Sequence, residues 1–108
     1  MRMWMVDPRL MCRQHLLGEH VELHMVAASL RNGTSLQGFI ENQLIETHNV
    51  RRRHEQLVGE MKRRGFKHAS PLKNVPRKRA GCVDRRANLL ELARRCEHCR
   101  ELQEIAKR

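Results

Sequence analysis

Apolar residues recur at helical spacing in three long stretches of the chain, and helix-ending residues separate these stretches. Residues three, four or seven positions apart share one face of an α-helix. In the first stretch Asp7 is a good N-cap, Pro8 suits the first helical position, and Gly33 can adopt the left-handed conformation that ends a helix. We therefore predict a helix from Asp7-Pro8 to about Leu30, preceded by a short extended arm over residues 1–6.

The same reasoning predicts two further helices. Thr47 is a candidate N-cap for a helix over about 48–64, which Gly65 would close. Asp84 can cap a third helix that runs to about Lys107. Over residues 34–46 the sequence predicts a short helix or a turn packed on the core.

The remaining long segment, residues 67–83, is rich in Pro, Gly, Lys and Arg and predicts a basic loop. No stretch shows convincing strand character. The sequence therefore predicts an all-α fold. We expect a compact single domain over residues 1–108, with three main helices and an extended N-terminal arm.

The charge of the chain indicates a polyanionic partner. Its 22 Lys and Arg residues outnumber 12 Asp and Glu residues, which gives a formal net charge of +10. A small, strongly basic protein with clustered arginines is typical of nucleic-acid binding. A membrane surface is a poorer match because aromatic anchors are scarce. No apolar run approaches the roughly 20 residues that span a bilayer, and no signal peptide is recognisable, so we expect a cytoplasmic location.

Arg51, Arg52 and Arg53 open the second predicted helix, at the positive end of the helix dipole. Three basic residues are unfavourable there unless they have another task, and contact with DNA phosphates would supply one. The basic cluster over residues 62–64 needs no such explanation, because it lies at the negative end of the same helix.

The cysteines were considered as metal ligands. Cys96-Glu97-His98-Cys99 is a C-x-x-C pair, but structural zinc sites need four ligands, and a second cysteine pair is missing. Cys12 and Cys82 would complete a site only if the fold brought them together. On a continuous helix, Cys96 and Cys99 are explained as small buried apolar groups, so we predict no bound metal and no cofactor.

His15, Glu19 and Glu22 share one face of the first predicted helix. Such a face is commonly just solvated. It borders apolar positions, however, and lies close to the chain terminus. An α-amine has a reference pKa of about 7.7–8.0, so part of it is neutral at pH 7 and can form a Schiff base. Acid–base groups beside such an amine could transfer the protons of that reaction.

These residues resemble a known family, the phage-type pyrimidine-dimer DNA glycosylases known as endonuclease V. The likeness covers nearly the whole chain, with patchy identity. The segments that carry it are the arm with Arg2, Gln14-His15-Leu16, Glu19, Glu22-Leu23, Phe39, residues 48–53, residues 60–66 and, more weakly, Ala93-Arg94.

The resemblance implies an all-helical fold in which the arm threads between long helices, and a bifunctional activity. The terminal α-amine attacks the sugar C1′ at a damaged base and forms an imine, and β-elimination then nicks the strand. The nucleophile falls on Met1, which we expect to be retained because Arg2 is bulky. By the same resemblance, Glu22 transfers protons and stabilises the cationic imine, and His15 lies near the sugar or phosphate. Arg2 contacts the DNA, and Arg94 contacts a phosphate.

Two departures from the family pattern bear on the lesion. Two further arginines of the family's first helix are Val21 and Met25 here. The chain also lacks the aromatic C-terminal tail of the family and has no Tyr. These departures affect the groups that would contact the DNA and recognise the lesion, and not the groups that would form the imine.

The sequence thus predicts a metal-independent DNA glycosylase with abasic-site lyase activity that acts as a monomer on damaged double-stranded DNA. The predicted catalytic residues are Met1, Glu22 and His15, and the predicted DNA-binding residues are Arg2, Arg51, Arg52, Arg53 and Arg94. Two alternatives remain: a non-catalytic nucleic-acid-binding module, and a small zinc-stabilised basic protein that uses Cys96 and Cys99.

Overall fold

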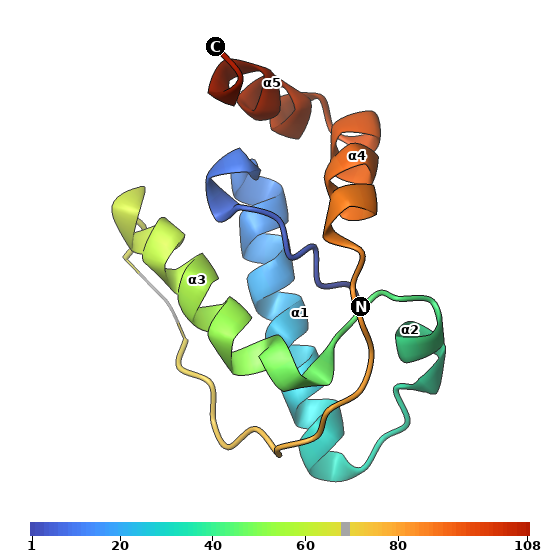
Figure 1. Ribbon diagram of the computed structural model, residues 1–108. Coiled ribbons are helices and arrows are strands. Elements are labelled where there is room, and N and C mark those ends of the chain that lie inside the picture. Colours follow the sequence, from blue (N-terminus) through green and yellow to red (C-terminus); the bar gives the residue numbers. More distant parts are fainter. Residues whose placement is uncertain (68–69) are drawn as a thin grey trace.

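The computed structural model describes residues 1–67 and 70–108 and is all-α, as predicted (Figure 1). The described part contains no strand and no helix that is both long and apolar enough to cross a membrane. Its elements in chain order are the 3-10 helix η1 (Pro8–Leu10), α1 (Arg13–Asn32), α2 (Gln37–Glu41), the 3-10 helix η2 (Thr47–Asn49), α3 (Val50–Arg63), α4 (Arg85–Arg95) and α5 (Glu97–Ala106).

The hydrophobic core lies where α1 and α3 pack against each other and against the N-terminal arm, residues 1–6. Each large apolar side chain that leaves water contributes about 1.5–3 kcal/mol to stability. The arm supplies Met3, Trp4 and Val6 to this core and is therefore part of the fold. The buried apolar residues of the helices and their flanks include Leu16, Leu23, Val26 and Ala27 of α1, Ile45, Val50, Leu57 and Met61 of the α3 region, and Leu92 and Cys99 of α4 and α5.

The first predicted helix starts later than expected. Asp7 and Pro8 do open a helical turn, with the Asp7 carboxylate accepting the N–H of Arg9, but that turn is the separate element η1. The backbone is extended at Met11, and α1 begins at Arg13. The guanidinium of Arg64 donates to the carbonyls of Pro8 and Met11, which a continuous helix would have bound internally. The predicted end at Gly33 is confirmed, with φ at 71°.

The second predicted helix is present as η2 followed by α3, and Gly65 ends it with φ at 84°. Thr47 is not its cap, so that prediction is wrong. The hydroxyl of Thr47 donates to the carbonyl of Lys78 and accepts the N–H of Ala80. Thr47 therefore binds the basic loop (the basic segment, residues 67–83) to the start of α3.

The third predicted helix begins at its predicted cap, since the Asp84 carboxylate accepts the N–H of Ala87. It is not one helix, however. Cys96 leaves the helical conformation, with φ −131° and ψ 114°, and its sulfur accepts the N–H of Cys99 at the start of α5. Figure 1 shows α5 turned away from the direction of α4. The third predicted helix is therefore present as two consecutive helices, α4 (Arg85–Arg95) and α5 (Glu97–Ala106).

The predicted basic loop, residues 67–83, is irregular at Lys67 and over residues 70–83, whereas His68 and Ala69 lie outside the described residues. Its end packs closely on the segment before α3. Gly81 has φ at 86°, and a Cβ there would collide with the carbonyl oxygen of Ile45. Only glycine fits this close approach without strain.

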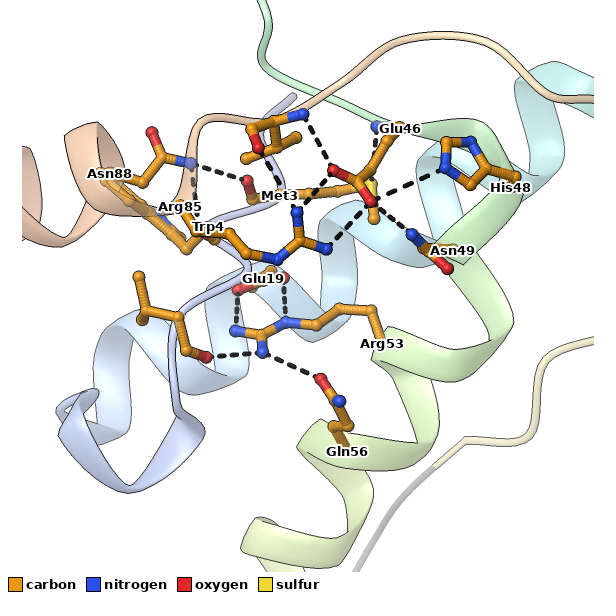
Figure 2. A network of polar contacts seen from close by, with 12 residues as sticks. Met3, Trp4, Glu19, Glu46, His48, Asn49, Arg53, Gln56, Arg85 and Asn88 are labelled. Atoms are coloured by element: carbon orange, nitrogen blue, oxygen red, sulfur yellow. Dashed lines mark hydrogen bonds and ion pairs between the residues drawn. The ribbon is translucent and has the colours of Figure 1, made fainter.

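Glu46 joins the start of α3 to the start of α4 (Figure 2). Its buried carboxylate accepts the backbone N–H of Val83 at 2.9 Å and the guanidinium of Arg85 at 3.1 Å, and it also binds the Asn49 amide. Burial alone would raise the pKa of Glu46. The three hydrogen-bond donors outweigh burial, so its pKa lies below the ordinary value of 4.5.

We predict that the stability contributed by Glu46 depends on pH. A carboxyl group with a pKa that is lower in the folded state stabilises the protein above its unfolded pKa, and this contribution is lost as the pH falls through the folded value. Glu46→Gln should lower the free energy of unfolding by about 1–3 kcal/mol at pH 7. Urea denaturation should show this difference shrinking below about pH 4.5. A difference that stays constant down to about pH 3, which is about 1.5 pH units below 4.5, would contradict the lowered pKa of Glu46.

Candidate active site at the N-terminal arm

The backbone of the N-terminal arm is bound by groups from several surrounding elements. The N–H of Met3 donates to the carbonyl of Leu44 at 2.7 Å. The side-chain amide of Asn88, on α4, donates to the carbonyls of Met3 and Trp4 at 3.2 and 3.0 Å. Arg53, on α3, donates to the carbonyl of Val6 at 2.6 Å. The chain terminus is therefore held in a defined place.

That place is next to Glu22, on α1. The Glu22 carboxylate accepts the backbone N–H of Arg2 at 3.0 Å, one residue from the terminal amine. It is only partly buried, so a substrate can still approach it. A carboxylate near an amine can accept its proton and can stabilise positive charge that develops on its nitrogen. The structure holds Glu22 at the residue that follows Met1, so two of the three residues predicted to be catalytic lie in the same region.

The side chain of Arg2 turns towards α4. It donates to the side-chain oxygen of Asn88 at 2.7 Å, and its guanidinium carbon lies 4.1 Å from the centre of the Trp4 ring. This cation–π contact and the hydrogen bond give Arg2 a position within the protein, where it is partly buried.

Asn88 is the residue at this site that the sequence analysis missed. Its amide oxygen holds the Arg2 side chain, while its amide nitrogen holds two arm carbonyls, and it is only 5% exposed. No motif marks it. The available signal was its place one turn after the Asp84 cap, on the face of α4 that also carries Leu92.

His15 lies beside cysteines. Its Nδ1 atom is 3.2 Å from the sulfur of Cys12 and 3.7 Å from the sulfur of Cys99, and its ring meets Trp4 edge-on at 5.9 Å between centroids. Burial, reinforced by the positive charge of Arg95, lowers the pKa of His15 and favours the neutral imidazole. His15 therefore touches the arm through Trp4.

Glu19 and Arg53 form a buried ion pair (Figure 2). The guanidinium binds both carboxylate oxygens of Glu19, at 2.6 and 2.9 Å, and the two side chains are 0% and 1% exposed. Arg53 also donates to Gln56 and to the arm. The charge of Arg53 is thus neutralised inside the protein, where Arg53 joins α3 to α1 and to the arm.

Arg51 and Arg52 differ from Arg53 because both are exposed. Arg51 borders a groove of about 470 Å³ formed with the basic segment, whose lining includes Arg77, Lys78 and Arg79. Several cations around one groove form a suitable surface for a phosphate backbone.

Arg94 is also exposed, at 71% of its side chain, and pairs with Glu91. Hydrogen bonds from Arg94 lower the pKa of Glu91 to about 2. The predicted DNA-binding residues therefore divide into exposed ones (Arg51, Arg52 and Arg94), a partly buried one (Arg2) and a buried one (Arg53).

An all-helical, strongly basic protein with a firmly held N-terminal arm has features suited to binding a polyanion such as DNA. The comparison with known families is specific. A family model described as pyrimidine dimer DNA glycosylase matches residues 1–74, and the chain belongs to that family. No curated protein and no solved structure matches the chain.

The family match includes the arm, Glu22, α1 and α3, but it ends before α4 and α5. The Asn88 that holds the arm therefore lies outside the matched segment. Val21 and Met25, where the resemblance led us to expect arginines, are both exposed on α1, at 57% and 49%.

We predict opposite effects for two neighbouring arginines. Arg53→Ala leaves Glu19 buried without a partner, which should cost about 3–5 kcal/mol of stability in urea denaturation. Arg52→Ala should change stability by no more than about 0.5 kcal/mol, but it should weaken DNA binding and reduce the salt dependence by about one phosphate contact. Equal stability of the two variants would contradict the structural role of Arg53.

Proposed function

We propose that this protein is a DNA repair glycosylase with abasic-site lyase activity, acting through an imine on the α-amine of Met1. Family membership supports the glycosylase class. The observation that carries the mechanism is the hydrogen bond from the Arg2 N–H to Glu22, because it fixes a carboxylate beside the terminal amine.

In the proposed reaction the neutral amine attacks C1′ of the damaged nucleotide. The N–C1′ bond forms as the bond from C1′ to the base breaks, and the base departs with a proton. Opening of the sugar ring gives the imine. Loss of a C2′ proton then expels the 3′ phosphate by β-elimination, and water releases the product. The protonated imine is itself the electron sink, so this chemistry requires no metal.

Glu22 is the proposed acid–base group. It accepts the proton of the attacking amine, stabilises the cationic imine and is placed to assist removal of the C2′ proton. His15 assists by packing against Trp4, which helps to fix the arm. The target base must leave the stack, because C1′ is otherwise hard to approach in a duplex.

The proposed substrate is damaged double-stranded DNA with a pyrimidine lesion, of which the pyrimidine dimer is the one that the family description names. Arg51, Arg52 and Arg94 are the proposed phosphate contacts because they are exposed. Arg2 joins them if DNA displaces its bond to Asn88. We further propose a single domain, a monomer and a cytoplasmic location, in keeping with four free cysteines.

A second candidate function is non-catalytic nucleic-acid binding. Val21 and Met25, exposed on α1 where the resembled family has arginines, favour it because they depart from the pattern of the enzyme family. This candidate predicts salt-sensitive binding of DNA without strand cleavage, whereas the proposed enzyme should both bind DNA and cleave the strand.

We predict that Glu22→Gln separates turnover from binding. The amide oxygen of Gln can still accept the Arg2 N–H, so the arm keeps its place while the carboxylate is lost. Nicking of a duplex with one pyrimidine dimer or abasic site should slow by about 10²–10⁴-fold, with DNA affinity nearly unchanged. Glu104→Gln, at an exposed carboxylate on α5, is the matched control and should nick at the normal rate. Normal nicking by Glu22→Gln would refute the mechanism.

A further inference from the structure

Four side chains with metal-binding atoms meet where α1 begins and where α4 passes into α5. Cys12 and His15 come from the start of α1, and Cys96 and Cys99 come from the junction. Their three sulfur atoms and one ring nitrogen all lie within 4.8 Å of one another. We propose that these four residues form a structural zinc site.

Two of the separations between these atoms agree with tetrahedral zinc. With Zn–S at about 2.3 Å and Zn–N at about 2.0–2.1 Å, tetrahedral geometry places two sulfurs about 3.8 Å apart and a sulfur about 3.6 Å from a nitrogen. The sulfurs of Cys12 and Cys96 are 3.8 Å apart, and the Cys99 sulfur is 3.7 Å from His15 Nδ1. The Cys12 sulfur is closer to that nitrogen, at 3.2 Å, so zinc binding would require the imidazole to move away from Cys12 by a few tenths of an ångström.

Three thiolates and one imidazole are a preferred ligand set of structural zinc. The ligands come as two pairs of equal spacing, Cys12-x-x-His15 and Cys96-x-x-Cys99. Each thiol that binds gives its proton to solvent, and His15 binds as the neutral imidazole through Nδ1. The fourth cysteine, Cys82, is exposed and is not part of the cluster.

The backbone around the cluster supports thiolates. The N–H of Cys12 points at the sulfur of Cys99 at 3.2 Å, and the N–H of Cys99 points at the sulfur of Cys96 at 3.5 Å. Donors of this kind disperse the negative charge of metal-bound sulfur. The break in the helix at Cys96 also has a role here, because it presents that sulfur to Cys12.

A zinc ion at this position would fasten α4 and α5 to the start of α1. These two short helices lie beyond the segment that matches the family model. α4 carries Asn88, which binds the arm, so the metal would stabilise the support of the arm from a distance. The inference stands on the cluster alone and does not rest on the proposed function.

Metal content tests the proposal directly. The full chain, purified in reducing buffer without chelator, should contain one zinc per chain by elemental mass spectrometry. Cys96→Ser and Cys99→Ser should contain almost none, whereas Cys82→Ser, the matched control, should retain one. Zinc-free wild-type protein that also fails to take up added Zn²⁺ would overturn the proposal. So would zinc that persists in both cluster variants, for instance on the neighbouring set His20, His24 and His54.

Cobalt substitution covers the case in which the cysteine variants fail to fold. Co²⁺ bound to the wild-type chain should give the intense visible bands of a tetrahedral site and thiolate-to-cobalt charge-transfer absorption. Added Zn²⁺ should displace it and abolish both features. A weak octahedral spectrum without charge transfer would overturn the assignment.

Discussion

The buried ion pair between Arg53 and Glu19 joins α1 to α3 and fixes the end of the N-terminal arm at the same time. Two charges without solvent are tolerated only when their hydrogen-bonding groups are bound. The guanidinium meets this requirement with both carboxylate oxygens of Glu19, the carbonyl of Val6 and the amide of Gln56. If the arm left its place, the buried guanidinium of Arg53 would lose the carbonyl of Val6 as its hydrogen-bond acceptor.

The other arm contacts build on this anchor. Asn88 holds the middle of the arm from α4, and Glu22 holds its start from α1. Three residues at successive positions on one face of α1 thus serve three tasks: His15 packs against Trp4, Glu19 supports Arg53, and Glu22 accepts the N–H of Arg2. The proposed nucleophile lies at the end of this arm, and the network restricts the motion of the arm, which is what a positioned reactive group requires.

Local signals made much of the fold predictable. Helical periodicity located the long helices, and Gly33, Gly65 and the Asp84 cap gave correct boundaries because each acts through its own backbone or near neighbours. The failures involve partners far along the chain. Thr47 is used by the basic segment, and the helix predicted up to Lys107 breaks where Cys96 meets Cys12.

The site divides in the same way. The carboxylate of Glu22 was predictable from helical spacing, proximity to the terminus and a family resemblance. The burial of Arg53 was not, because three consecutive arginines look alike until one of them meets Glu19 across 34 positions. Cys12 and His15 were not predictable as a ligand pair, because only the fold places them beside Cys96 and Cys99.

The central claim is that the α-amine of Met1 is the nucleophile. Borohydride reduction during reaction with a duplex containing one abasic site, followed by digestion and mass spectrometry, tests it most directly. The predicted result is a covalent DNA adduct on the α-nitrogen of the N-terminal peptide, which disappears when residues are added before Met1. An adduct on a lysine side chain, or no adduct with the native terminus, would contradict it.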